Sequence, residues 1–287
     1  MKQKKKLAIF LALAMSGFYG VANAEEGDDK VVHKEEENAY ANAVSLSDTT
    51  YEKTGGRLEA VAKGSGDVTA HTLYGDNSII TLQDVTVHAS AEGDNPDVIA
   101  VYGVNGSNIN INGGVIQAES NSGRKVANAI YAWDSTVSVN ENGNSGTTII
   151  HGDVVSYGND GNVLINLNTA DSELKGTAQT MSGGEINLSL SNQAVWETDG
   201  HFKSIITSLT MDHGIIRPTY TGSKAIRIEN YSGVGDILLD IEDNRQTGDI
   251  DVDAGGTNIT AAAKGSVLNM TVQNDNFIDT ITPEKAM

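Results

Sequence analysis

Cysteine is absent from this 287-residue sequence, and proline and aromatic residues are scarce. The chain has three prolines, two tryptophans and 5% aromatic residues in total. Without cysteine, disulfides, thiol nucleophiles and zinc-thiolate sites are excluded, so stability must come from burial and backbone hydrogen bonds. Because proline would delete a hydrogen-bond donor from a strand ladder, its scarcity favours β-structure.

Basic residues are outnumbered two to one by acidic ones, 19 against 38, which gives a formal net charge of −19. Four of the basic residues are lysines within the first six positions, and leaving them out gives 15 against 38, or −23. Charge of this sign repels phosphate backbones and anionic lipid surfaces. We therefore expect no nucleic-acid partner and no membrane insertion by this chain.

The amino terminus has the pattern of an export signal. Its lysines precede an apolar run from Leu7 to Met15, and the small residues Ala22-Asn-Ala24 follow. The run is shorter than the roughly 20 residues that span a bilayer, which favours a cleavable signal peptide over a retained helix. We predict a signal peptide over residues 1–24 and a polar leader or amino-terminal cap over residues 25–45.

Apolar and polar residues alternate through most of the remaining chain, as in Asn108-Ile-Asn-Ile-Asn112. A period of two is typical of strands that bury one face, and no helical stripe is present. The steps between the first inward residues of successive strands are 29 (Ile80 to Ile109), 28 (to Val137), 26 (to Val163) and 23 (to Ile186). Repeats of roughly 20 to 50 residues mark solenoids or propellers, and uneven steps favour a solenoid because corner loops vary without disturbing stacked strands.

These patterns predict an all-β fold, a right-handed parallel β-helix (β-solenoid), over residues 46–274, with a carboxy-terminal tail over residues 275–287. The phase of the alternation changes at Gln83-Asp84, which predicts a corner there. The 31 glycines suit such corners because glycine accepts positive φ angles without a steric cost.

The carboxy-terminal half resembles the passenger domains of pertactin-like and AIDA-type autotransporters. The residues that carry the resemblance are Leu188-Ser-Leu-Ser-Asn-Gln-Ala-Val-Trp196, Ile206-Thr-Ser-Leu-Thr-Met-Asp-His-Gly-Ile-Ile216, Ile228-Glu-Asn-Tyr-Ser-Gly-Val-Gly-Asp-Ile-Leu-Leu239 and Gly248-Asp249. The resemblance implies a β-helix whose last coils nucleate folding during secretion. In that family an outer-membrane β-barrel, the translocator, follows the passenger, and no such strand series follows here. We interpret the chain as a truncated gene product, a fragment or one half of a split system.

The resemblance implies a surface adhesin or virulence-associated binding protein without catalysis. Expected partners are a host surface protein or glycan, or like chains on neighbouring cells. The expected location is the periplasm for this chain alone, and the cell surface or the exterior if a translocator is supplied. A nonfunctional remnant of an autotransporter is an alternative.

The second alternative is a polysaccharide lyase or hydrolase built on the same scaffold. Its best constellation is formed by outward-facing charged residues of neighbouring strands, namely Arg227, Glu229, Asp236, Asp240 and Glu242. A glycosidase requires two carboxyl groups roughly 5 to 9.5 Å apart. Cross-strand ion pairing, such as Arg227 with Asp240, explains the same residues more simply.

Three other motifs are interpreted without chemistry. The carboxylates of Asp249-Ile-Asp-Val-Asp253 do not match a calcium loop, and Gly158-Asn-Asp-Gly161 is a single turn. The histidines are scattered and include no helical metal-binding pair; they are His33, His71, His88, His151, His201 and His213. No catalytic, cofactor-binding or metal residue is assigned, and no cofactor is expected.

The two tryptophans raise the question of a stacking platform. Trp196 lies in the coil motif of the resemblance and is predicted to pack at a corner or cap. Trp133, with Tyr131 on the same strand face and Tyr102 upstream, carries the hypothesis of an exposed aromatic patch.

Overall fold

The chain folds as a parallel β-helix, seen here in a computed structural model. The structure describes residues 22–26, 28–121, 126–141, 146–198, 202–218, 226–239, 249–251, 258–261, 269–271 and 280–283. These residues form strands, turns and bends and contain no helix. Within the same ranges, no helical segment has the length and apolarity that crossing a lipid bilayer requires.

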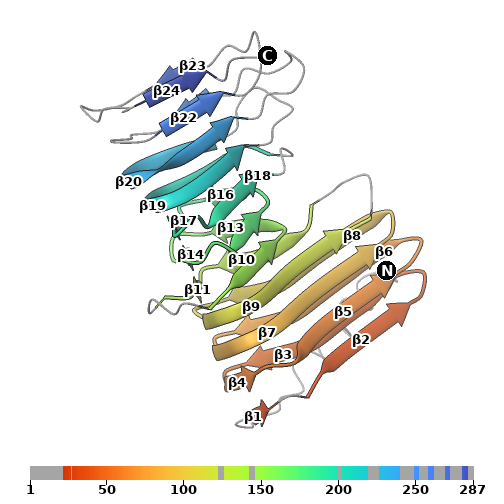
Figure 1. Cartoon of the computed structure of the whole chain (residues 1–287). Helices are drawn as coiled ribbons and strands as arrows, with labels where there is room; N and C mark the ends of the chain where they lie inside the picture. Colours follow the sequence, from red (N-terminus) through yellow and green to blue (C-terminus); the bar gives the residue numbers. More distant parts are fainter. Residues whose placement is uncertain are drawn as a thin grey trace.

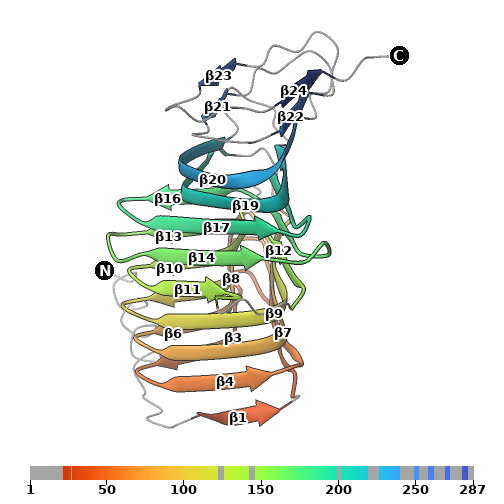
Figure 2. The same cartoon turned by 60° about the vertical axis from the view of Figure 1, so that its left-hand side comes forward.

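Each coil contributes strands to three faces, and every strand pairs in parallel with its counterpart one coil away (Figures 1 and 2). The first face contains β1 (Ala22–Glu26), β4 (Thr50–Thr54), β7 (Ile79–Glu92), β9 (Asn108–Ser120), β11 (Thr136–Val139), β14 (Asn162–Leu167), β17 (Glu185–Ser191), β19 (Ser204–Pro218) and β20 (Ile226–Leu239). The second face contains β2 (Lys30–Glu35), β5 (Arg57–Lys63), β12 (Thr148–His151), β15 (Glu173–Lys175), β18 (Val195–Thr198), β22 (Asn258–Ala261) and β24 (Thr280–Pro283), with the later parts of β7, β9, β19 and β20.

The third face contains β3 (Tyr40–Ser47), β6 (Asp67–Asp76), β8 (Asn95–Val104), β10 (Asn128–Trp133), β13 (Asp153–Tyr157), β16 (Ala178–Met181), β21 (Asp249–Asp251) and β23 (Asn269–Thr271), with the first parts of β19 and β20. The coils wind right-handed as they rise from β1 (Figure 2). The fold class predicted from the alternation is therefore confirmed.

The register also confirms the predicted coil spacing residue by residue. Ile80 lies beside Ile109, and the column continues through Val137, Val163 and Ile186. All five side chains are fully buried. Because burying one such aliphatic side chain stabilises the fold by about 1.5–3 kcal/mol, repeated columns of this kind hold the rod together without disulfides.

The corner between the third and first faces is built from residues in the left-handed backbone region. One residue per coil occupies this position, and the series is Asp48, Asn77, Asn105, Asp134, Gly158 and Ser182. Short polar residues and glycine tolerate positive φ better than other types do. Adjacent coils are tied together here, since Asn77 Nδ2 donates to Asp48 Oδ1 at 2.7 Å. The corner predicted at Asp84 is confirmed by its φ of 53°.

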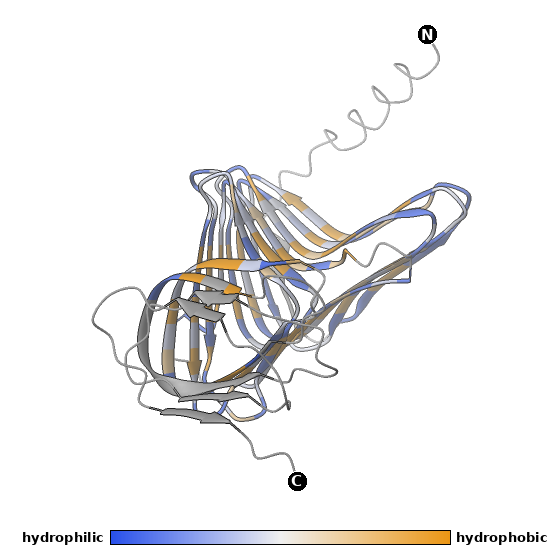
Figure 3. Ribbon diagram, turned by 90° about the horizontal axis from the view of Figure 1, so that it is seen from above, coloured by the Kyte–Doolittle hydropathy of each residue, from blue (hydrophilic) through white to orange (hydrophobic). Residues whose placement is uncertain are grey.

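The amino-terminal coils carry a narrow arm in which the second and third faces pack against each other (Figure 3). Small buried residues fill this arm; they include Ala41, Ala60, Ala62, Ala70, Ala89, Ala91, Ala100 and Ala118. Alanine permits the two sheets to approach closely, whereas Ile, Val and Leu fill the wider body. The arm is absent from the coil of β12 and β13, where Gly152 alone joins the two strands.

Strands occur on both sides of the predicted limits of the solenoid. β2 and most of β3 lie within residues 25–45, the segment predicted as a polar leader or amino-terminal cap. Small residues such as Ala39 and Ala41 fill the core there, so this segment shows no strong aliphatic pattern. β24 lies in the predicted tail and pairs with β22. Residues 1–21 of the predicted signal peptide lie outside the described residues, and β1 spans the predicted cleavage point.

Candidate binding surface

A row of aromatic side chains follows the outer side of the third face, here termed the aromatic ladder. Its members are Tyr74 on β6, Tyr102 on β8, Tyr131 and Trp133 on β10, and Tyr157 on β13. Tyr102 lies between Tyr74 and Tyr131 in the register, and Trp133 lies beside Tyr157. Neighbouring ring centroids are 5.4 to 5.6 Å apart and meet edge to face. This geometry is favoured for aromatic pairs, so the rings are ordered before a ligand arrives.

The aromatic ladder extends toward the amino terminus through a histidine. The ring of His71 lies 5.5 Å from that of Tyr102 and 6.2 Å from that of Tyr40, centroid to centroid. His71 Nε2 is 3.0 Å from Asp97 Oδ2, which fixes the imidazole against the strand. Trp133 and Tyr40 are each 46% exposed, so the row is open to solvent at both of these rings.

The phenols of Tyr74, Tyr102 and Tyr131 stay protonated at physiological pH. Burial, together with the smaller effects of the neighbouring Tyr131, Tyr74 and Asp97, raises the pKa of Tyr102 to about 12. Burial is also the main cause that raises the pKa of Tyr74 and of Tyr131. Neutral phenol groups can both donate and accept hydrogen bonds, so the ladder combines apolar ring faces with polar tips.

A groove, here termed the corner groove, follows the corner between the third and first faces. This corner begins where the strands that carry the aromatic ladder end. The volume of the corner groove is about 770 Å³, and its lining residues are Asn105, Gly106, Ser107, Asn108, Asp134, Ser135, Thr136, Asn159 and Asp160. Asp134 directly follows Trp133 in the chain, so the groove borders the ladder. Every lining residue is glycine or carries a hydrogen-bonding side chain, and none is basic.

The shape of the corner groove depends on Gly158. Its φ is +87°, and a Cβ atom added there would lie 2.0 Å from Asp134 Oδ1. Only glycine therefore leaves room for the Asp134 carboxylate, which also accepts a hydrogen bond from the Asp160 backbone nitrogen at 3.4 Å. The Gly161 nitrogen donates to the Gly158 carbonyl at 3.0 Å, so this stretch forms the predicted turn.

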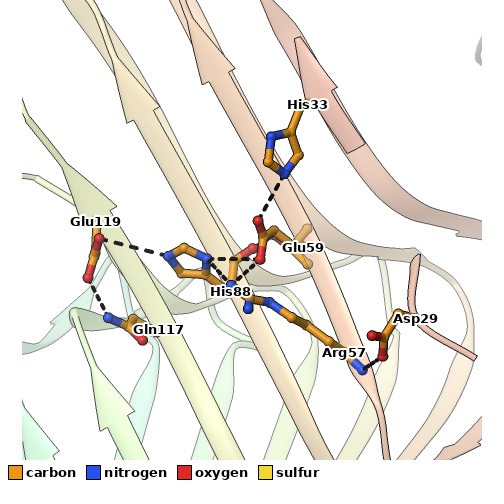
Figure 4. A network of polar contacts seen from close by, with 8 residues as sticks. Asp29, His33, Arg57, Glu59, His88, Gln117 and Glu119 are labelled. Carbon is orange, nitrogen blue, oxygen red and sulfur yellow. Dashed lines mark hydrogen bonds and ion pairs between the residues drawn. The ribbon is translucent and has the colours of Figure 1, made fainter. Parts of the chain in front are cut away.

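A second row, here termed the charge ladder, follows the outer side of the second face. Register places one member per coil, in the order Glu59, His88, Gln117, His151, Lys175 and Glu197. Figure 4 shows its amino-terminal end, where His33, Arg57 and His88 converge on Glu59. Glu59 Oε1 is 3.0 Å from His33 Nε2, and Oε2 is 3.5 Å from His88 Nδ1 and pairs with Arg57.

The charge ladder joins neighbouring coils rather than forming an open reaction centre. Both oxygens of Glu59 are engaged by basic side chains, and its side chain is only 9% exposed. Farther along, Lys175 Nζ lies 2.9 Å from Glu197 Oε1, and this hydrogen bond raises the pKa of Lys175. Opposite charges on adjacent strands stabilise the pairing, although exposed pairs contribute little. In the described ranges, no group of three or more His, Asp or Glu is arranged to hold a metal ion.

Two residues of the alternative enzyme site, Arg227 and Asp236, lie on different faces of the solenoid. Arg227 pairs in register with Ile205 and Asp251 on the third face, whereas Asp236 pairs with Ile215 and Asn258 on the second. Asp240 and Glu242 lie outside the described residues, as do Asp253 and His201. Glu229 is exposed.

The prediction for Trp196 needs correction. It is fully buried in the core of the second face, and its Nε1 donates to the Gly176 carbonyl at 3.1 Å. Trp196 therefore packs inside the rod rather than at a corner or cap.

The hypothesis of an aromatic patch is confirmed in its geometry and was incomplete in its members. The sequence singled out Trp133, Tyr131 and Tyr102 and missed Tyr74 and Tyr157. The sequence did contain a signal for Tyr74. The step from Tyr74 to Tyr102 is 28 residues and the step from Tyr102 to Tyr131 is 29 residues, and both match the coil spacing. Tyr157 follows a shorter coil, so no fixed step finds it.

No protein-family model, no curated protein and no solved structure matches the chain. Its function is therefore inferred from the residues and their arrangement.

Proposed function

We propose that this chain is an exported binding protein, a surface adhesin of the autotransporter passenger type. The observation that carries the proposal is the aromatic ladder, a row of partly exposed rings on a rigid rod. Tyrosine and tryptophan are enriched at binding surfaces because they bring large contact areas at low conformational cost.

The resemblance of the carboxy-terminal half supports the passenger type. Three of its four quoted segments fall on β17 and β18, on β19 and on β20, and β19 pairs with β17 and β18 on one side and with β20 on the other. The amino-terminal lysines and apolar run support export. The charge ladder serves cohesion of the rod in this proposal and has no part in binding.

Attachment of particles to cells tests the adhesin proposal. Beads coated with the mature chain, residues 25–287, are incubated with cultured epithelial cells beside beads coated with an unrelated acidic protein. We expect the mature chain to increase attachment well above the acidic control. Equal attachment of the two bead types would contradict the proposal.

Export is tested separately by sequencing the amino terminus of the chain expressed with its own leader in a Gram-negative host. We expect the exported chain to begin at Glu25, because cleavage follows Ala22-Asn-Ala24. Recovery of the chain only from the cytoplasm, with Met1 retained, would contradict export.

A further inference from the structure

We propose that the aromatic ladder and the corner groove form one binding site for a neutral, linear glycan that lies along the axis of the rod. The inference rests on the proposed binding function and names the class of ligand that this surface takes. It follows from ring exposure, the lining of the groove, the charge of the surface and the repetition of the coils.

The rings provide the apolar part of the site. The pyranose ring of a sugar has faces made of C–H groups, which pack on aromatic rings, and an edge of hydroxyl groups, which needs polar partners. Trp133 is 46% exposed and has Tyr157 beside it, and Met181, 45% exposed, continues the same column. Tyr157 holds the indole of Trp133 in an edge-to-face contact before a ligand binds. The indole therefore loses little side-chain freedom when a sugar packs on its face.

The groove provides the polar part. Sugar hydroxyls both donate and accept hydrogen bonds, so they require both kinds of partner. The amides of Asn105 and Asn159 carry a donor and an acceptor each, and the carboxylates of Asp134 and Asp160 accept. Trp133 of the aromatic ladder and Asp134 of the corner groove are consecutive residues, so one ligand can contact both features.

Charge decides between classes of glycan. The ladder has Asp97 at its base, and the groove contains Asp134 and Asp160 with no lysine or arginine in its lining. The mature chain carries a formal charge of −23, from 15 basic and 38 acidic residues. This field repels uronic, sialylated and sulfated glycans and leaves neutral ones unopposed.

Repetition of the coils favours a polymer. Strands in a sheet are about 4.8 Å apart, so the rod presents rings at regular steps along its axis. A linear glycan also repeats along its length, and each unit that meets a further ring adds to the affinity through effective concentration. The surface of a globular protein has no such repeat.

Titration with soluble oligosaccharides tests the site. The probes are oligomers of glucose and of N-acetylglucosamine of graded length, with a sulfated glycan as the anionic probe. Binding is followed by intrinsic fluorescence, since Trp133 is exposed whereas Trp196 is fully buried. We expect a neutral oligomer to bind, its affinity to rise with chain length, and the sulfated glycan not to bind.

Variants locate the site. We expect Trp133→Ala to weaken binding about tenfold or more, as loss of a central aromatic contact does, and Trp133→Tyr to restore most of it, both measured by calorimetry. Phe202→Ala is the matched control, because Phe202 is 44% exposed and lies outside the ladder. Binding of no neutral oligomer, preference for the sulfated glycan, or equal weakening by Phe202→Ala would overturn the proposal.

Failure of this inference and failure of the adhesin proposal give different results. If coated beads attach to cells and the Trp133→Ala beads attach equally well, the adhesin proposal stands and the glycan site is wrong. If neutral oligomers bind in solution and the beads attach to no cell, the glycan site stands and the adhesin proposal is wrong.

Discussion

Two neighbouring isoleucines on β7 provide a direct test of how the rod is stabilised. Ile80 is fully buried and Ile79 is 55% exposed, although the two side chains are identical and adjacent. Replacing Ile80 by alanine removes three carbon atoms, and at about 0.8 kcal/mol each their transfer contributes roughly 2.4 kcal/mol. The cavity left behind raises the expected loss of unfolding free energy to about 3–4 kcal/mol. Ile79→Ala should cost about 0.5 kcal/mol, as surface substitutions do.

The pair of variants is its own control. Both lose the same β-branched side chain from the same strand, so differences in strand propensity cancel and the remaining difference reports burial. Urea unfolding followed by circular dichroism measures it as a lower midpoint for Ile80→Ala at an unchanged slope. Equal destabilisation by the two substitutions would refute the argument that alternate residues line the core.

Two further predictions follow from packing and from titration. Gly75→Ala places a Cβ atom 2.8 Å from Ile80 Cδ1, so this substitution should lower the urea midpoint of unfolding. Adding Ile80→Val removes Cδ1, so the double variant should recover part of the lost midpoint in the same assay. The pKa of Tyr102, raised from 10.0 to about 12, means that the folded state keeps a proton that the unfolded state has lost. The contribution of this phenol to stability is therefore complete below pH 10 and disappears as the pH rises to about 12. Between these pH values, the unfolding free energy should fall less steeply with pH for Tyr102→Phe than for the unchanged chain. An equal slope for the two proteins would contradict the assignment of the raised pKa to Tyr102.

The inward columns of the rod were accessible from the sequence because alternation is a local property. Ile80, Ile109 and Val137 could be aligned by counting, and the register places them side by side. The amino-terminal coil escaped this method, since Ala39 and Ala41 bury little area and alternate with residues that look like a solvated leader. Alanine gives only a weak hydrophobic pattern in a sequence. In a narrow arm, where two sheets must approach closely, its small side chain is nevertheless the one that fits.

The sequence by itself determined the fold class, the inward residues and the coil length, because a period of two selects the buried face of a strand wherever that strand lies. Only the tertiary structure decided which outward residues meet across coils. Glu59 joins His88, and Trp133 joins Tyr157, through corners whose lengths differ from coil to coil. Contacts between residues that are 24 to 29 positions apart depend on every loop between them, and loop length leaves no periodic trace in the strands.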